Sequence, residues 1–459
     1  MRRKPDAEAL SQAHPPSMDS LLGEAKTAPL LELYGREAVK EELRHAIEQG
    51  QILAEALIEE TASSLALRFS PSLKAAINAT GVLLHTNLGR APLSAAAREA
   101  LDRIAAGYST LEYDVRTGER GRRQDHVRRA ACELFGCEDA IAVNNNASAV
   151  FLALCALARG RRVLVSRGEL VAIGGSFKIP EILEASGASL AEVGTTNRTT
   201  IGDYRGALTS EVALILTVHP SNYEIRGYTM RPEPEQIAAL AREAGIPWLH
   251  DQGTGCVVRL EEFGVAGEPT VAKVLGDGAD LVTFSGDKLF GGPQAGFLIG
   301  RSNFVVRAAS HPVARVVRPD KLTFAALATT LAAWKTGRWR ELPIYQKAAA
   351  SLTSLEERGG KIREALRGLP LAIDLVESSA LFGGGTSPEK RFPSRALALA
   401  HPTAGAEELA RGLREQNPPV VGRVEDGRCR LDLRSIDPSE DALVTAALEV
   451  LAAEVPRLR

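Results

Sequence analysis

A lysine in a glycine-rich stretch is the first residue whose position suggests chemistry. Lys288 stands in the sequence SGDKLFGGPQAG, after the apolar run 281–284, and Ser285 precedes it by three residues. A buried ammonium group is costly unless something uses it. Upstream, Asp251 follows a second apolar run, 247–250. A lysine that can form a Schiff base and an aspartate that keeps a pyridine nitrogen protonated are the pair that pyridoxal phosphate chemistry requires.

A candidate phosphate site precedes both residues along the chain. The apolar run 140–143 leads to Asn146, Ala147 and Ser148, which open the apolar segment 150–158. Free N–H groups at a helix N-terminus would hold the phosphate of the cofactor. Taken singly, these residues fit a helix cap without a ligand, the aspartate a turn and the lysine a surface hairpin. The order of the three signals favours the cofactor site.

Two more residues that follow predicted strands are expected at the cofactor. His219 opens a polar turn after the run 213–218, and Ser285 ends the run before Lys288. Because the carboxyl ends of parallel strands gather ligands at one edge of a sheet, we expect both residues beside the cofactor.

A second group of basic residues is not explained by the cofactor. Arg90 ends the stretch HTNLGR, and Arg315 and Arg318 lie three residues apart on one predicted helical face. The planar guanidinium fork suits tetrahedral oxyanions, so the three could bind a phosphate-bearing co-substrate, although surface ion pairs with acids are the alternative. The run 116–129 holds six arginines against two acids. It fits a nucleic-acid patch, an active-site loop or a solvated face equally well.

The elements that must position these residues alternate between short β-rich and helical runs from about residue 75. This alternation predicts an α/β fold, a mostly parallel sheet covered by helices. A helical pattern occupies residues 19–69, where Val39, Leu43 and Ala46 share one face, and a smaller α+β profile follows residue 334. We therefore predict an N-terminal helical domain at 1–70, a large catalytic domain at 71–335 and a small C-terminal α+β domain at 336–459.

Composition excludes several classes of protein. The 459-residue chain has 45% hydrophobic and 24% charged residues and a net charge of −2, so no global attraction for nucleic acid is expected. No apolar window reaches the length of a membrane span, and we expect a cytoplasmic protein without a membrane partner. The five cysteines show neither CxxC nor metal-ligand spacing, so neither a metal site nor a disulfide framework is predicted: Cys132, Cys137, Cys155, Cys256 and Cys429.

Seven stretches together resemble one family, the bacterial selenocysteine synthases or L-seryl-tRNA(Sec) selenium transferases. The resemblance covers most of the chain from residue 70 onward, and LLELYGREAVKEELR resembles the family's N-terminal helical domain. The stretches are INATGVLLHTNLGRAPLS (77–94), NNNASAV (144–150), SRGELVAIGGSFKIPEI (166–182), HPSNYEIRGYT (219–229), SGDKLFGGPQAG (285–296), HPVARVVRPDK (311–321) and GGGTSPEKRFPS (383–394). One departure is Thr254, which stands where a serine is common in the family; both residues carry a hydroxyl.

The resemblance implies a fold-type-I pyridoxal phosphate transferase. By resemblance, Lys288 forms the Schiff base, Asp287 accompanies it in catalysis, and Asp251 partners the pyridine nitrogen. Asn146, Ala147 and Ser148 lie on the phosphate-holding turn. Arg90, Arg315 and Arg318 match the positions that bind selenophosphate.

The implied reaction converts L-seryl-tRNA(Sec) to L-selenocysteinyl-tRNA(Sec) through a cofactor-bound aminoacrylate, with selenophosphate as the selenium donor. The N-terminal domain would grip the tRNA, and the chain would form dimers within a homodecamer. The main alternative is a related pyridoxal phosphate lyase that acts on a small amino acid or amino sugar. A non-catalytic tRNA-binding descendant would be expected to lose Lys288 or Asp251, and both are present.

Overall fold

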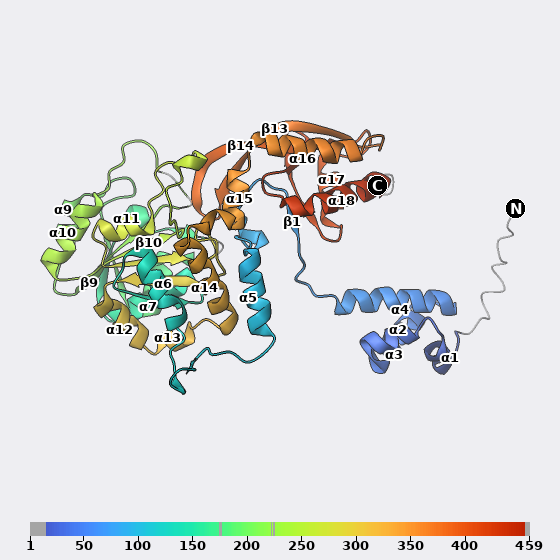
Figure 1. Cartoon of the computed structure of the whole chain (residues 1–459), viewed down its shortest axis with the longest axis horizontal. Coiled ribbons are helices and arrows are strands. Elements are labelled where there is room, and N and C mark those ends of the chain that lie inside the picture. Colours follow the sequence, from blue (N-terminus) through green and yellow to red (C-terminus); the bar gives the residue numbers. More distant parts are fainter. Residues whose placement is uncertain (1–14, 174–176, 222, 224, 455–459) are drawn as a thin grey trace. The chain divides into compact units, whose positions relative to one another are not determined.

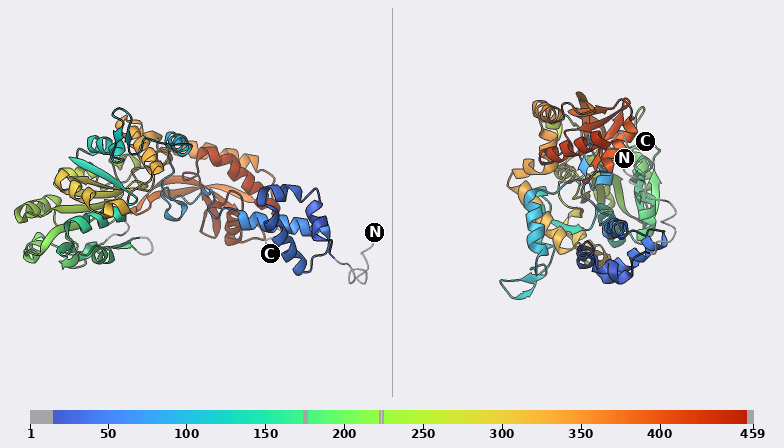
Figure 2. Two further views of the ribbon diagram at one scale, coloured as in Figure 1. Left: turned by 90° about the horizontal axis from the view of Figure 1, so that it is seen from below. Right: turned by 90° about the vertical axis from the view of Figure 1, so that its right-hand side faces the viewer.

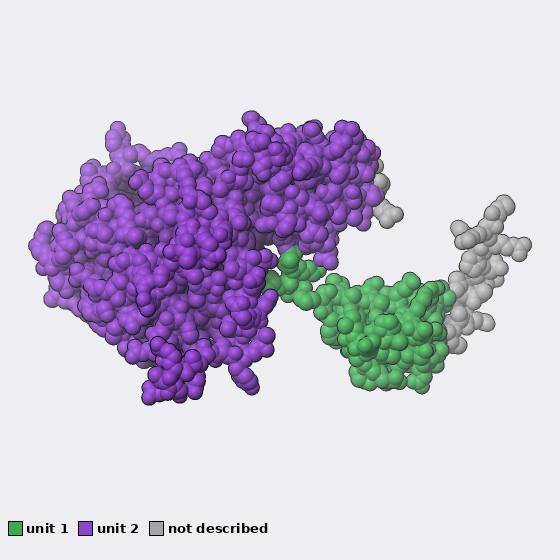
Figure 3. Space-filling model, viewed as in Figure 1, with its two compact units in different colours: residues 1–75 green, residues 76–459 purple. Residues whose placement is uncertain are grey.

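The chain folds into two compact units, residues 1–75 and 76–459 (Figure 3). The computed structural model describes residues 15–173, 177–221, 223 and 225–454. In the described residues no helix is both long and apolar enough to cross a bilayer. The second unit contains both segments predicted to be the catalytic and the small C-terminal domain, and the roles of these domains stay predictions.

The first unit is a small helical bundle. Ser17 caps its first helix by accepting a hydrogen bond from the Ser20 N–H, and Gly35, at φ 81°, separates the second helix from the third. The apolar face predicted from the helical spacing is present: Val39 and Leu43 are fully buried and Ala46 nearly so. The four helices are α1 (Met18–Gly23), α2 (Ala28–Tyr34), α3 (Arg36–Glu48) and α4 (Ala54–Phe69).

A seven-stranded sheet forms the centre of the second unit (Figure 1). Its strands run parallel except β12, which is antiparallel to both of its neighbours. The apolar runs singled out in the sequence, 140–143, 213–218, 247–250 and 281–284, all lie in or directly beside strands of this sheet. In spatial order the strands are β4 (Asp139–Val143), β12 (Gly296–Gly300), β11 (Leu281–Ser285), β10 (Trp248–Gly253), β9 (Val212–Val218), β5 (Arg162–Ser166) and β8 (Ser189–Val193).

Helices cover both faces of this sheet, which is why its inner strands β9, β11 and β12 are buried along their whole length. Successive residues of β12 point to opposite faces: Phe297 and Ile299 join one apolar core and Leu298 the other. The first core packs against α6 (Asp125–Phe135), α10 (Pro234–Ala244), α11 (Val271–Gly276) and α14 (Lys321–Lys335). The second packs against α7 (Asn146–Leu157), α8 (Ile179–Ser186) and α12 (Ser302–Ser310).

The C-terminal part of this unit is built on an antiparallel sheet in the order β13-β14-β17-β16. The strands are β13 (Ala372–Gly383), β14 (Thr386–Ala400), β16 (Arg423–Glu425) and β17 (Arg428–Asp432), and the helices are α15 (Pro343–Ala349), α16 (Leu352–Ala365), α17 (Ala406–Arg414) and α18 (Asp441–Glu454). Helix α16 packs against β13 and β14, and Figure 2 shows the orange and red helices of this part beside its strands. The profile is the α+β one predicted for this segment.

Shorter elements connect these parts. They are α5 (Ala95–Ala105), α9 (Ile201–Ala207), α13 (Val313–Val316), the hairpin β2–β3 (Tyr113–Asp114, Glu119–Arg120), the pair β6–β7 (Ala172–Ile173, Phe177–Lys178) and the pair β1–β15 (Ile77–Asn78, Val420–Val421). Single 3-10 turns occupy Thr86–Leu88, Arg167–Glu169, Glu261–Phe263, Arg338–Glu341 and Pro438–Glu440.

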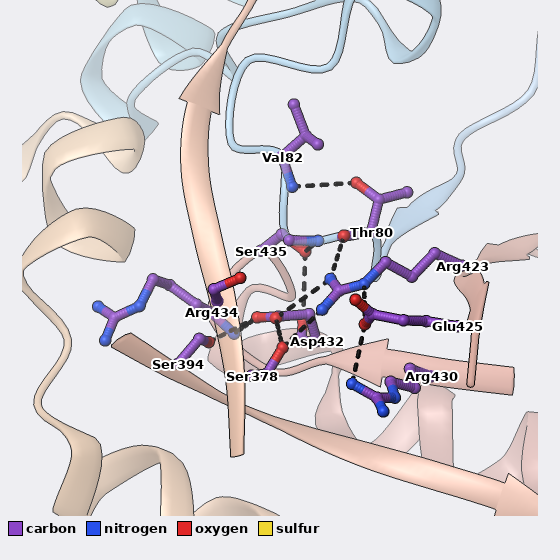
Figure 4. A network of polar contacts seen from close by, with 12 residues as sticks. Thr80, Val82, Ser378, Ser394, Arg423, Glu425, Arg430, Asp432, Arg434 and Ser435 are labelled. Atoms are coloured by element: carbon purple, nitrogen blue, oxygen red, sulfur yellow. Dashed lines mark hydrogen bonds and ion pairs between the residues drawn. The ribbon is translucent and has the colours of Figure 1, made fainter. Parts of the chain in front are cut away.

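A buried polar network anchors the start of the second unit to its C-terminal sheet (Figure 4). Asp432 is fully buried and accepts hydrogen bonds from Ser378 Oγ (2.5 Å) and Ser394 Oγ (2.6 Å). Arg423 Nη1 donates to the Thr80 carbonyl at 2.6 Å. The segment that leads toward Arg90 is therefore fixed at its upstream end by charge-assisted bonds.

Candidate active site

Eight of the predicted site residues line one cavity of about 390 Å³. It opens at the carboxyl ends of β9, β10 and β11, where a parallel sheet gathers its ligands. The eight are Arg90, Asn146, Ala147, His219, Asp251, Ser285, Asp287 and Lys288. All of them except Arg90 lie at the end of a strand, follow a strand or open a helix at this edge, which is why residues far apart in the sequence meet here.

Lys288 lies in the turn 286–290, within the loop that joins β11 to β12. Only 5% of the residue is exposed. Burial, and next the positive charge of Arg90, lower the pKa of the lysine, while nearby carboxylates oppose the shift. Gly286 keeps the turn narrow, because a Cβ at this position would lie 2.7 Å from the Pro293 carbonyl oxygen. The lowered pKa favours the neutral amine, which is the form able to act as a nucleophile or base.

Asp251 is a buried carboxylate at the end of β10. Its Oδ1 accepts hydrogen bonds from Asn146 Nδ2 at 2.8 Å and from Thr283 Oγ1 at 3.2 Å. Burial raises the pKa of Asp251, and these bonds and the charge of Lys288 partly offset the rise. The Oδ1 atom of Asn146 is buried without a partner among the described residues.

The predicted catalytic residue Asp287 forms an ion pair with Arg90. The Arg90 Nη1 atom donates to Asp287 Oδ2 at 2.8 Å, and the aspartate side chain is only 7% exposed. Arg90 has a positive φ of 63°, a conformation that side chains other than glycine rarely adopt. Asp287 Oδ1 is buried and has no partner in the described part of the chain. Its free oxygen leaves one acceptor available at the cavity.

The turn that the sequence predicts to hold a phosphate lies at the N-terminus of α7. Asn145 caps the helix: its side-chain oxygen accepts the Ser148 N–H at 2.8 Å. Asn146 and Ala147 line the cavity, whereas Ser148 does not, and its N–H is used by the cap. Strand β12 approaches so closely that a Cβ at Gly296 would lie 2.1 Å from the Asn145 carbonyl oxygen.

His219 lies between the cavity and a buried acid. Its backbone N–H donates to the Asp251 carbonyl at 2.9 Å, and its Nε2 lies 3.3 Å from Glu268. Thr254 Oγ1 donates to the same carboxylate at 2.6 Å. The resemblance leads us to expect a serine at position 254, and the threonine hydroxyl present there fixes the Glu268 carboxylate, which in turn contacts His219. Nothing in the sequence pattern marked Glu268 as part of this arrangement.

Arg315 and Arg318 line a different cavity, of about 490 Å³. The structure thus separates these two arginines from Arg90 within one chain. Four arginines of the run 116–129 share the second cavity: Arg120, Arg122, Arg123 and Arg128. Part of the run therefore shares a cavity with the anion-binding candidates Arg315 and Arg318.

The donor set of the first cavity fits pyridoxal phosphate. A weakly basic lysine, a buried aspartate and a capped helix N-terminus surround about 390 Å³ of space. Two buried oxygens, Asn146 Oδ1 and Asp287 Oδ1, have no hydrogen-bond donor among the described residues, and a bound cofactor or substrate could supply one. Among the described residues no cluster of three or more His, Cys, Asp or Glu side chains is arranged to hold a metal.

A solved structure of D-glucosaminate-6-phosphate ammonia-lyase has a similar fold. It superposes with a TM-score of 0.60 at 19% identity and covers 85% of this chain and 98% of the other. At this identity the likeness concerns the fold alone. With the sheet order described above, it agrees with the predicted α/β fold-type-I class.

Sequence comparisons connect the chain to proteins of one activity. An L-seryl-tRNA(Sec) selenium transferase of Geobacter sulfurreducens is 46% identical over 386 residues, 83% of this chain and 84% of that protein. One of Carboxydothermus hydrogenoformans is 44% identical over 436 residues, 92% of this chain and 93% of that protein. The family description "L-seryl-tRNA selenium transferase" matches residues 76–437, and "Selenocysteine synthase N terminal" matches residues 16–49. The chain therefore belongs to the L-seryl-tRNA selenium transferase family, as the sequence motifs predicted.

Proposed function

We propose that this protein converts L-seryl-tRNA(Sec) to L-selenocysteinyl-tRNA(Sec) with pyridoxal 5′-phosphate as its cofactor and selenophosphate as its selenium donor. Family membership supports the enzyme class and the cofactor. The observation that carries the proposal is the convergence of Lys288, Asp251 and the Asp287–Arg90 pair on one cavity. The cytoplasmic location predicted from the sequence belongs to the same proposal.

Three groups would hold the cofactor. Lys288 would bind its aldehyde carbon, Asp251 would keep its pyridine nitrogen protonated, and the N–H groups that open α7 at Asn146 and Ala147 would receive its phosphate. Ser285 and His219 line the same cavity and complete its wall. The bound cofactor supplies an electron sink that stabilises negative charge at the Cα atom of the seryl group.

The side chains of this protein move the protons. The low pKa of Lys288 suits it to take the Cα proton of the seryl group. Asp287 holds Arg90 through Oδ2, and its unpartnered Oδ1 would orient the seryl hydroxyl by accepting its hydrogen bond. Lys288 would then return the proton taken from Cα to this hydroxyl, which leaves as water. The small exposure of both residues excludes water, which strengthens these interactions.

The selenium donor would be bound by arginines. Arg90 lies beside Lys288, but Arg315 and Arg318 lie in the second cavity of the same chain. We propose that a neighbouring copy of the chain brings its second cavity to this site within a dimer, and that such dimers assemble into the homodecamer that the resemblance implies. A single chain then holds only part of the donor site.

The helical unit would recognise the tRNA. By sequence, residues 1–75 hold nine Lys and Arg against twelve Asp and Glu, so net charge cannot supply the affinity. The affinity for tRNA must come from shape complementarity and a few local cations. We therefore expect tRNA binding to depend less on salt concentration than it would for a basic domain.

The test uses the purified yellow protein with seryl-tRNA(Sec) and seryl-tRNA(Ser), with selenophosphate added. We expect selenocysteine to form only on tRNA(Sec), and selective retention of that tRNA on a filter to disappear when residues 1–70 are deleted. Cofactor binding without preference for tRNA(Sec) would refute the proposal. Release of ammonia from a small amino acid or amino sugar would then support the alternative, a pyridoxal phosphate lyase. The similarity to the ammonia-lyase structure concerns the fold alone and does not by itself favour that alternative.

A further inference from the structure

The second cavity carries a surplus of positive charge. Six arginines and three acids line its roughly 490 Å³: Arg120, Arg122, Arg123, Arg128, Arg315, Arg318, Glu112, Asp125 and Asp139. Arg128 and Asp139 neutralise one another through contacts of 2.5 and 2.8 Å. Arg122 and Arg315 make no ion pair with any residue that the structure describes.

Glu112 is the point where three of these arginines meet. Its Oε1 accepts from Arg123 Nε at 2.8 Å and from Arg318 Nη1 at 3.2 Å. Its Oε2 accepts from Arg120 Nη2 at 3.3 Å. The side chains of Glu112 and Arg318 are each 30% exposed. One half-buried carboxylate therefore orients three guanidinium groups that come from two distant parts of the chain.

The arrangement is tied to the central sheet. Arg123 Nη1 also donates to the carbonyl of Pro319, the residue after Arg318, at 2.9 Å. The neighbouring Gln124 exchanges two hydrogen bonds of 2.8 Å with the backbone of Ala142 on the edge strand β4. Arg318 is consequently held by Glu112 on its side chain and by Arg123 on its adjacent backbone.

The remaining charge fits an oxyanion. Three guanidinium groups share one carboxylate in this cluster, and the planar fork of each has donors to spare. A tetrahedral oxyanion accepts parallel hydrogen bonds from such forks.

We infer that Glu112 is a positioning residue that holds Arg120 and Arg123 together with Arg318, one of the arginines to which the proposed function assigns the selenium donor, and that the three guanidinium groups form one oxyanion site. The identity of this ligand rests on the proposed function, whereas the existence of the site does not. Glu112 touches the arginines and not the reacting atoms.

The test measures binding of radiolabelled inorganic phosphate to the full-length holoenzyme by equilibrium dialysis. Glu112→Gln removes a negative charge, so electrostatics alone predicts tighter phosphate binding. If Glu112 positions the arginines, the opposite is expected, a loss of about tenfold or more in phosphate affinity. The guanidinium groups are then no longer held in place and lose charge-assisted hydrogen bonds to the phosphate. Glu119→Gln is the matched control: it removes the same charge from β3, the partner of the strand that begins directly after Glu112, and Glu119 makes no ion pair among the described residues.

Two further variants keep the test decisive. Glu112→Asp retains the charge and is expected to recover part of the affinity that Glu112→Gln loses. If Glu112→Gln fails to fold, Arg120→Gln replaces it, since Arg120 is 76% exposed and its loss should weaken phosphate binding without affecting the fold.

The inference is overturned if the wild-type holoenzyme does not bind phosphate, if Glu112→Gln binds it as tightly or more tightly, or if Glu119→Gln weakens binding equally. In turnover, Glu112→Gln should raise the KM for the selenium donor and leave kcat within a few-fold. A wild-type enzyme that binds phosphate through Glu112 but makes no selenocysteinyl-tRNA would refute the proposed function and leave this site standing.

Discussion

Glu169 gives the sharpest quantitative prediction, because it is an acid buried next to the active-site edge of the sheet. It ends the 3-10 turn after β5, is 8% exposed, and accepts the Val218 N–H at 2.9 Å. Burial raises the pKa of Glu169 from 4.5 to about 7, although the Val218 N–H and the charges of Arg231 and His219 oppose the rise. Below pH 4.5 the carboxyl is protonated in both the folded and the unfolded chain.

The effect on stability follows from proton binding. As the pH rises from about 4.5 to about 7, the unfolded chain releases this proton while the folded chain keeps it, so the free energy of unfolding falls. The full loss is about 3 kcal/mol and is complete above the folded-state pKa. Glu169→Gln removes the titration and keeps an oxygen for the Val218 N–H. Its free energy of unfolding relative to wild type should therefore rise by about 2–3 kcal/mol between pH 5 and pH 8.

Urea unfolding at the two pH values, followed by tryptophan fluorescence, measures this difference. The three tryptophans, at positions 248, 334 and 339, all belong to the second unit, so the signal reports the unit that contains Glu169. Glu184→Gln, at an exposed acid of α8, controls for the loss of one charge. The reasoning is refuted if the free energy of unfolding of Glu169→Gln differs from that of the wild type by the same amount at pH 5 and pH 8.

Three further changes test the site itself. Lys288→Ala should abolish both turnover and the yellow colour of the holoenzyme in absorbance spectra, and colour that survives dialysis would contradict its role. Asp251→Asn should retain the fold but lower kcat by about a hundredfold or more, since an amide cannot stabilise a protonated ring nitrogen; unchanged kcat would exclude that role. Gly296→Ala should lower thermal stability and cofactor affinity together, because its Cβ would stand 2.1 Å from the Asn145 carbonyl oxygen that begins α7; an unshifted melting temperature would show that β12 yields easily.

The sequence by itself determined the convergence of Lys288, Asp251 and Asn146. Each follows or opens an element with a clear local pattern, and in a parallel sheet the carboxyl ends of such strands share one edge. The alternation of apolar and helical runs was enough to predict that these three residues lie close together, without information on individual side-chain contacts. The same local patterns indicated the helical first unit and the α+β C-terminal segment.

Only the tertiary structure decided how the charged residues pair. Arg90 reaches Asp287, 197 positions away, from a left-handed backbone conformation that no local pattern indicates. Glu112 meets Arg318 across 206 positions, and both are polar residues in polar surroundings, so hydrophobic periodicity carries no information about them. Burial gives an acid or a lysine its altered pKa, and burial is a property of the assembled chain rather than of any segment.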